Sequence, residues 1–347
     1  MSLSTPLSEE KARCAINEKS KPVFIAALTV LLFDEIRQHQ GFTSGYLADN
    51  VSEIFSGVNQ GLLNKKLADL PDDTKMRYRE ELLKPVAKAA VLQSIGSYST
   101  EAAEIYQGDR FRVLPIEERN RLIDIINQKT LGYIKQGIGI PSRAFDTIEE
   151  KKHYKAYEAA KLQFTLKLVQ NKNDKNNELS DLLRIPVVYT SFILSTKEDF
   201  DYQRCYDAYD VIDQGVEKQD YNGNFGQLFL SIVGKFPIGS GLLFISKING
   251  QIERAMVSSI YPENPYEPIC KQITKGQVQA MTQSEVVISL ETNLYFETAR
   301  KNSEYDEDYF QSRYQGVYVW NANELWEVQI HAKTFWKKDT QRETERN

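Results

Sequence analysis

Two adjacent polar side chains, Gln93 and Ser94, stand between the apolar run 89–92 and the dipeptide Ile95-Gly96. A polar pair inside an apolar stretch can line a site for a ligand or a metal ion. An amide and a hydroxyl are neutral, and they do not hold a divalent cation as an imidazole and a carboxylate do. The pair therefore argues against a metal centre at this point of the chain.

Histidine and cysteine, the other common ligands of transition metals, are few and scattered. They are His39, His153, His331, Cys14, Cys205 and Cys270. No two histidines are three or four residues apart, so a metal site built by histidines on one helix face is not predicted. The absence of a Cys-x-x-Cys pair argues against a zinc knuckle or a redox motif. An odd, sparse set of cysteines is typical of a reducing cytoplasm.

The charge balance is acidic, with a formal net charge of −5 over 347 residues. This predicts no general nucleic-acid-binding face, although a local basic patch is not excluded. The longest apolar stretch, residues 23–33, is too short to span a bilayer. The N-terminus lacks the basic-then-apolar layout of a signal peptide. We therefore expect a cytoplasmic protein without a membrane span.

Helical patterns dominate the first two thirds of the chain. Apolar spacing, proline and glycine predict helices at 22–40, 46–58, 62–70, 75–98, 115–137, 147–170, 179–194 and 195–215. Pro115 is typical of a helical first turn, and Thr147 with Glu150 forms a capping box. Gly137 is expected to end the helix that begins near Pro115.

After residue 223 short β-prone runs replace the helical pattern. They lie at 229–233, 242–246, 255–260, 286–296 and 316–320, separated by Gly, Pro and Asn turns. We expect a mainly α protein: a flexible N-terminus at 1–20, a helical bundle at 21–222, a small α+β region at 223–336 and a charged tail at 337–347.

Several blocks of sequence follow one another in the order seen in a known family. They are Phe42–Tyr46, Ala90–Gly96, Leu114–Arg119, Leu183–Ser191 and Phe229–Ser240. Together they resemble the HD-GYP branch of the HD-domain phosphohydrolases, over about residues 22 to 275. The resemblance implies a bundle of helices that, in active members, holds a two- or three-metal centre and hydrolyses cyclic di-GMP.

The metal ligands of that family are replaced in this chain. Neutral or phenolic residues stand at the five matched positions, namely Tyr46, Gln93, Ser94, Asn127 and Thr190. The adjacent histidine pair and the Gly-Tyr-Pro sequence that give the family its name are also absent. Because catalysis in such a site needs a metal-bound hydroxide and a metal clamp on phosphate, the resemblance implies a pseudoenzyme with no catalytic residue, metal or cofactor.

The five replaced positions are candidates for a vestigial pocket. One interpretation is a ligand-sensing site that persisted after the metals were lost. The other is that these side chains satisfy one another's hydrogen bonds in a former cavity, because buried polar groups are usually paired. The leading functional prediction is a regulatory protein of bacterial signalling that binds a protein partner. A nucleotide is the second candidate ligand.

Two further functions stay open. The first is an active phosphohydrolase with a relocated site, for which carboxylates alone would hold Mg or Mn. Its candidate acids are Glu101, Glu104, Asp109, Glu149, Glu150 and Glu158. The second is a scaffold, perhaps a homodimer, with residues 276–347 as the interface. The aromatic residues of this region, among them Trp320, Trp326 and Trp336, predict either a small core or an exposed docking patch.

Overall fold

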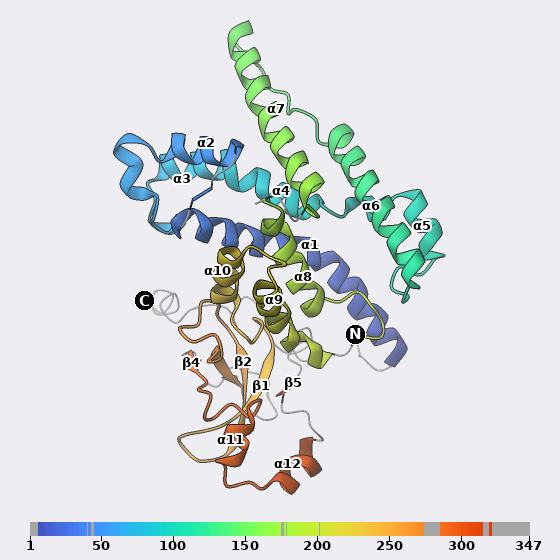
Figure 1. The fold of residues 1–347 in the computed structure, drawn as a ribbon, viewed down its shortest axis with the longest axis vertical. Helices are drawn as coiled ribbons and strands as arrows, with labels where there is room; N and C mark the ends of the chain where they lie inside the picture. Colours follow the sequence, from blue (N-terminus) through green and yellow to red (C-terminus); the bar gives the residue numbers. More distant parts are fainter. Residues whose placement is uncertain are drawn as a thin grey trace, which may run out of the picture. The chain divides into compact units, whose positions relative to one another are not determined.

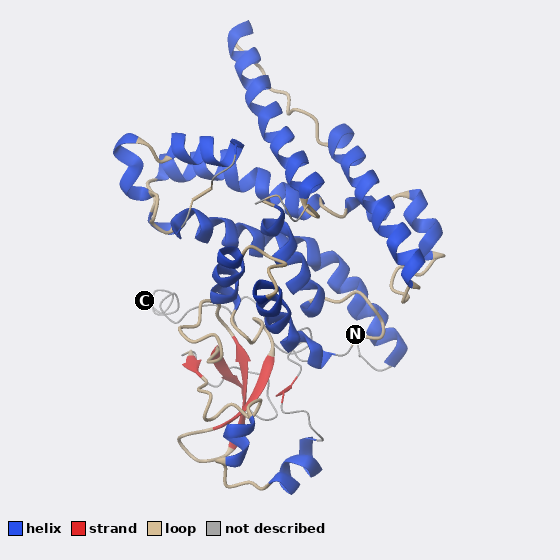
Figure 2. Ribbon diagram, viewed as in Figure 1, coloured by secondary structure: helices blue, strands red, loops and turns tan. Residues whose placement is uncertain are grey.

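The structure is a computed structural model, and its backbone divides into two compact units. It describes residues 6–39, 41–42, 45–174, 177, 179–200, 202–273, 285–314 and 319–320. Unit 1 comprises Met1–Phe200 and Gly215–Leu228, and unit 2 comprises Asp201–Gln214 and Phe229–Asn347 (Figure 1). Among the described residues every strand belongs to unit 2 (Figure 2).

Unit 1 is built from helices, as the sequence predicts. They are α1 (Pro6–His39), α2 (Gly45–Ile54), α3 (Asp72–Tyr78), α4 (Lys84–Leu92), α5 (Thr100–Tyr106), α6 (Ile116–Gly137), α7 (Ile148–Asn171) and α8 (Ser180–Ile193). Helix α1 packs against α4 and α8, and α7 packs against α4. Short 3-10 segments η1 (Gly57–Leu62), η2 (Leu67–Asp69) and η4 (Ile95–Tyr98) and the π-helical segment η3 (Arg79–Leu83) connect them.

The start of α1 differs from the expected flexible N-terminus at 1–20. The helix begins at Pro6, and Pro22, expected in the first turn, lies inside it. Cys14 and Asn17 are buried, and the Asn17 amide donates to the carbonyl of Ser195 at 2.8 Å. Contacts with a segment far away in the sequence therefore order this polar stretch. Residues 1–5 lie outside the described residues.

A buried arginine holds the C-terminal end of α1. Arg37 is fully buried, and its Nε and Nη2 donate to Asp34 Oδ1 at 3.0 and 2.7 Å. Nη1 donates to the carbonyl of Leu63, and Nη2 also donates to that of Lys65 at 2.7 Å. The guanidinium thus ties the loop after η1 to α1 through charge-assisted bonds, which are the stronger kind.

Two aromatic rings complete the enclosure of Arg37. Its guanidinium carbon lies 5.1 Å from the ring centre of Phe55 and 5.0 Å from that of Tyr78. The Tyr78 hydroxyl donates to Asp34 at 2.9 Å. Burial, followed by the Asp34 charge, holds the pKa of Tyr78 well above its usual value. A desolvated cation between ring faces is a favourable arrangement.

Unit 2 contains a five-stranded antiparallel sheet. Its strands are β1 (Gly241–Ile245), β2 (Ile252–Val257), β3 (Ile269–Ile273), β4 (Val286–Val287) and β5 (Val319–Trp320), in the order β4-β3-β2-β1-β5. Gly241 pairs with Met256, which sets the register of β1 on β2. The remaining elements of unit 2 are η5 (Tyr202–Tyr206), α11 (Glu297–Lys301) and α12 (Glu307–Tyr314). The boundaries between the units fall within two helices, α9 (Asp207–Glu217) and α10 (Gly223–Val233).

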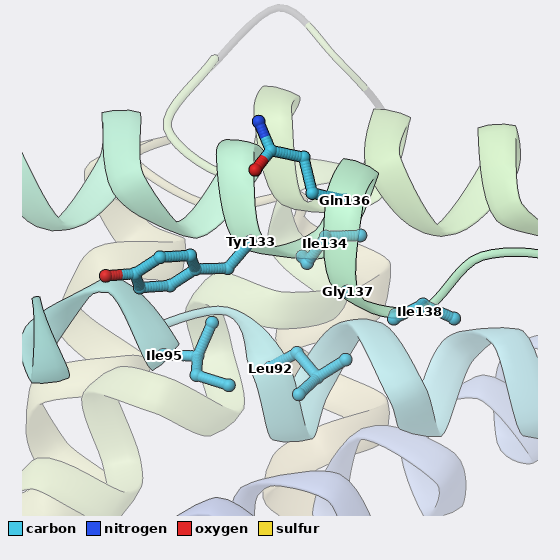
Figure 3. A pocket seen from close by; sticks show the side chains of 7 residues that line it. All are labelled: Leu92, Ile95, Tyr133, Ile134, Gln136, Gly137 and Ile138. Atoms are coloured by element: carbon cyan, nitrogen blue, oxygen red, sulfur yellow. The ribbon is translucent and has the colours of Figure 1, made fainter.

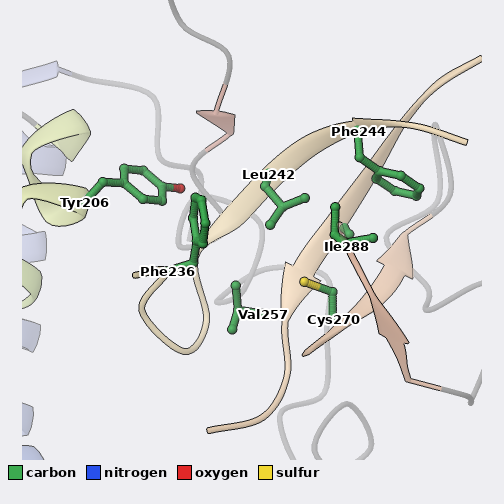
Figure 4. Packing of buried hydrophobic residues seen from close by; sticks show 8 residues of the cluster. Tyr206, Phe236, Leu242, Phe244, Val257, Cys270 and Ile288 are labelled. Carbon is green, nitrogen blue, oxygen red and sulfur yellow. The ribbon is translucent and has the colours of Figure 1, made fainter. Parts of the chain in front are cut away.

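Leu243, Leu294 and Phe310 form one buried cluster of unit 2. A larger cluster lies on one face of the sheet. Its buried members are Tyr206, Phe236, Leu242, Phe244, Ala255, Val257, Cys270 and Ile288 (Figure 4). Tyr295 and Phe296 pack against this core, with Phe236 in edge contact with both rings. Part of the aromatic C-terminal sequence therefore does belong to a small core. Trp326 and Trp336 lie outside the described residues, and so does His331.

Several predicted elements are wrong. The helix expected at 62–70 is replaced by turns and the 3-10 segment η2, and of the strand expected at 286–296 only Val286–Val287 forms a strand. Residues 229–233, expected as a strand, end helix α10, because Asn222 Oδ1 accepts the amides of Asn224 and Phe225 and so caps a helix. Residues 195–215, expected as one helix, are not helical at 195–200. Leu194 ends α8 with a non-helical ψ of 61°, and the Ser195 hydroxyl accepts the amide of Lys197 in a turn.

We predict that Arg37→Met lowers the free energy of unfolding by about 3–5 kcal/mol. The substitution leaves the partly buried carboxylate of Asp34 and the carbonyls of Leu63 and Lys65 without their donor. The control is Arg143→Met. Arg143 also pairs with a carboxylate, Glu150, and stacks on two rings, but its side chain is 52% exposed. There the loss is expected to be below about 1 kcal/mol. Urea unfolding followed by circular dichroism measures both, and equal losses would contradict the role given to Arg37.

Candidate functional site

The Gln93–Gly96 block lies where α4 passes into η4 and meets α6. The Gly96 amide donates to the buried hydroxyl of Thr130 at 2.9 Å. A Cβ on Gly96 would meet the carbonyl of Ile126 and, at 2.7 Å, the amide nitrogen of Thr130. Only glycine allows the backbone of η4 to approach α6 this closely. Packing therefore accounts for the Ile95-Gly96 dipeptide without reference to a ligand.

An open pocket of about 570 Å³ lies beside this block. Its lining residues are Leu92, Ile95, Tyr133, Ile134, Gln136, Gly137 and Ile138. Leu92 and Ile95 point from α4 and η4 toward Tyr133 and Ile134 of α6, while the Gln136 amide points away from them (Figure 3). The pocket has a volume typical of ligand sites, and its walls are mostly aliphatic.

Gln93 and Ser94, which lie between two lining residues in sequence, differ in environment. Ser94 is exposed. Gln93 is buried, and its main-chain carbonyl accepts a hydrogen bond from Lys172 Nζ at 2.8 Å. Burial lowers the pKa of Lys172 to about 8. The side-chain nitrogen of Gln93 has no hydrogen-bond partner among the described residues. The block thus carries one unsatisfied amide donor, which can contribute a hydrogen bond and no metal coordination.

The other three candidates are held by separate parts of unit 1. The Thr190 hydroxyl donates to the carbonyl of Pro186 within α8, and Asn127 is half-buried on α6. Tyr46 on α2 stacks on Phe164 of α7, with ring centres 4.5 Å apart. In the described part of the chain, no hydrogen bond or ring contact joins any two of the five residues. The structure therefore shows no polar network formed by Tyr46, Gln93, Ser94, Asn127 and Thr190 together.

Tyr46 instead makes a hydrogen bond to the main chain of a distorted helix. Its hydroxyl donates to the carbonyl of Glu81 at 2.9 Å, inside the π-helical segment η3. Pro85, four residues after Glu81, has no amide hydrogen and cannot give that carbonyl its α-helical bond. Burial raises the pKa of Tyr46, which keeps the hydroxyl protonated as a donor. In sequence, Pro85 alone indicated that a carbonyl near Glu81 needs another partner.

Charged and aromatic side chains surround Tyr46, and of these the sequence singled out only Glu158. Arg77 pairs with Glu81 at 3.0 Å, and Lys161 pairs with Glu158. Burial and these carboxylates raise the pKa of Tyr157 to about 12. π-Helical turns often occur at functional sites. Here the surrounding charges are paired, so the cluster supports the packing of α2, η3 and α7.

The carboxylates proposed for a relocated hydrolase are mostly engaged elsewhere. Glu101 pairs with Lys129, Glu150 pairs with Arg143, and Asp109 accepts the amide of Phe111. The described residues contain no group of three His, Cys, Asp or Glu side chains that could hold a metal ion. His39 and His153 are exposed, as expected for solvated histidines. The described part of the chain thus offers no alternative metal site.

Comparisons with protein families, curated proteins and solved structures found no match to this chain. The resemblance to the HD-GYP branch therefore stays a prediction. Within the described residues, no helix is both long enough and apolar enough to cross a membrane.

We predict that Gly96→Ala lowers the free energy of unfolding by about 1–3 kcal/mol, because the added methyl group overpacks the η4–α6 contact. Gly132→Ala on α6 is the control, since a Cβ there meets nothing within 4 Å. In a helix interior this control should raise stability by about 0.5–1 kcal/mol. Thermal or urea unfolding would show opposite signs, and a neutral Gly96→Ala would contradict the close approach.

A thermodynamic cycle tests the role of Tyr46. We predict that Tyr46→Phe costs about 1–3 kcal/mol, because the carbonyl of Glu81 loses its donor. In a Pro85→Ala background the new backbone amide can supply a donor, so the same substitution should cost less than half as much. Urea unfolding of the four proteins gives the coupling energy. A Tyr46→Phe cost that is equal in both backgrounds would sink the explanation.

Proposed function

We propose that this chain is a catalytically inactive, HD-GYP-like regulatory protein that acts by binding a protein partner. The observation that carries the proposal is the pocket between α4, η4 and α6. It lies beside the residues that replace the metal-binding His-Asp pair, and it is lined by Leu92, Ile95 and Ile134 with no carboxylate or imidazole. Such walls suit an apolar side chain better than a metal-bound phosphoester.

A protein partner fits this pocket better than a cyclic dinucleotide does. Two phosphates would need cationic groups or several convergent amide donors. The polar lining side chains are Tyr133 and Gln136, both neutral and both exposed. Aliphatic walls with an aromatic residue at the edge are typical of pockets that take an anchoring side chain in protein interfaces. A nucleotide remains the second candidate.

A cytoplasmic location and a role in bacterial signalling complete the proposal. All three cysteines are free, with Cys14 and Cys270 buried, which agrees with a reducing compartment. The signalling role rests on the sequence resemblance. A relocated hydrolase finds no support in the paired carboxylates, and a homodimeric scaffold through residues 276–347 involves mostly positions outside the described residues.

We predict that the protein purified without a metal-affinity step contains no stoichiometric Fe, Mn or Zn. It should not hydrolyse cyclic di-GMP when Mg, Mn or Fe is added, because Gln93 and Ser94 supply no ligands. Elemental analysis and product chromatography measure both. Turnover that disappears in Gln93→Ala or Ser94→Ala would overturn the proposal.

Two glycines of α6 provide the test of partner binding. Gly137 lines the pocket, whereas Gly132 lies five residues earlier outside the lining, and both have open space at the Cβ position. Gly137→Leu should occupy the pocket and abolish co-purification of the partner from the native cells, while Gly132→Leu should retain it. Quantitative mass spectrometry compares the two. Equal retention would exclude this pocket as the binding site.

A further inference from the structure

Two aromatic rings near the start of α7 enclose a charged side chain from the segment before the helix. Phe145 and Tyr154 have ring centres 5.3 Å apart, with an angle of 55° between the ring planes. The guanidinium carbon of Arg143 lies 5.1 Å from the ring centre of Phe145 and 4.6 Å from that of Tyr154. Its Nη2 also donates to Glu150 Oε1 at 2.8 Å. Two rings and one carboxylate thus surround a single cation.

The carboxylate and one of the rings are held in place by the helix itself. The amide of Asp146 donates to Glu150 Oε2 at 3.0 Å, and the amide of Glu150 donates to Thr147 Oγ1 at 3.1 Å. These two bonds form the capping box of α7 and fix the Glu150 side chain. Tyr154 follows four residues later, so it lies on the same face of the helix. None of these contacts requires Arg143.

Arg143 belongs to a segment that the rest of unit 1 holds only weakly. Residues 139–145 are neither helix nor strand, and their main chains make no hydrogen bond with any described residue. The first turns of α7 extend past the end of α6, so this part of the unit is open to solvent (Figure 1). The side chains of Arg143 and Glu150 are 52% and 38% exposed. Because exposed ion pairs contribute little to stability, Arg143 can leave the rings at small cost to the fold.

The charges of this stretch make the vacated site attractive to another cation. Arg143 is the ion-pair partner of Glu150, and no second one occurs among the described residues. The other charged side chains nearby in sequence, none of which pairs with Glu150, are Asp146, Glu149, Lys151, Lys152 and Lys155. These two acids and three lysines nearly balance one another. Without Arg143, an unpaired carboxylate and two ring faces would therefore remain, and both kinds of group attract positive charge.

We propose that Phe145, Glu150 and Tyr154 bind the guanidinium group of an arginine side chain supplied by a protein partner, and that Arg143 occupies this site until the partner arrives. The seated guanidinium defines the ligand class, because this group stacks on aromatic faces while it donates to a carboxylate. Arg143 is thus an internal competitor. That the arginine belongs to a protein rests on the proposed function, whereas the guanidinium chemistry does not. The site shares no residue with the apolar pocket, so the two can be tested separately.

N-acetylarginine methylamide is the probe for this site, and the corresponding citrulline compound is its neutral control of similar shape. Saturation-transfer NMR on the full chain measures the binding of both. Arg143→Ala should bind the arginine compound roughly three- to tenfold more tightly than the wild type does, because removal of the competitor leaves the site fully available. The citrulline compound, which lacks the charge, should bind to neither protein.

Double variants test whether binding occurs at these residues. Arg143→Ala/Tyr154→Ala and Arg143→Ala/Glu150→Gln should each bind the arginine compound roughly three- to tenfold more weakly than Arg143→Ala. Glutamine keeps the capping box, so the second variant removes the charge alone. The matched control is Arg143→Ala/Tyr157→Ala, because Tyr157 is a 39% exposed ring on the same helix that does not contact Arg143. Its affinity should stay within about twofold of that of Arg143→Ala.

Any of three results would overturn the proposal. The first is equal binding of the arginine and citrulline compounds to Arg143→Ala, including no binding of either. The second is equal affinity of the wild type and Arg143→Ala for the arginine compound. The third is an affinity that Tyr154→Ala does not change. Circular dichroism should show that all these variants fold, since the altered side chains are exposed or half-buried. The co-purification test with Gly137→Leu concerns the apolar pocket alone, so a failure there leaves these outcomes readable.

Discussion

A single buried guanidinium, that of Arg37, organises one end of unit 1. It neutralises Asp34, takes two loop carbonyls as acceptors and lies between two aromatic rings. Each of these groups would be costly to bury without the others. The contacts therefore restrict the backbone conformation of the loop after η1. Because α1 also packs against α4 and α8, the position of its C-terminal end constrains the helices that carry the candidate site.

In the candidate site, packing accounts for residues on which the resemblance to a metal-site motif rests. Gly96 is required where η4 touches α6, and Tyr46 supplies a donor near Pro85. Both residues belong to blocks that resemble metal-site motifs, yet each has a structural reason in this chain. What distinguishes the site chemically is an aliphatic pocket and an unsatisfied amide on Gln93. These features favour binding over hydrolysis.

The sequence by itself determined the elements whose ends are set by residues close together in the chain. The Thr147 capping box and Gly137 set the start of α7 and the end of α6 as predicted. The β-prone runs at 242–246 and 255–260 predicted β1 and β2, although the change of pattern expected after residue 223 falls on helix α10. Residues 229–233 end helix α10, whose N-cap at Asn222 is itself a local signal that the short apolar run obscured. Tertiary structure decided the rest. The hydrogen bond from Asn17 to the carbonyl of Ser195 joins residues far apart in the chain, and no local pattern encodes a contact between distant segments.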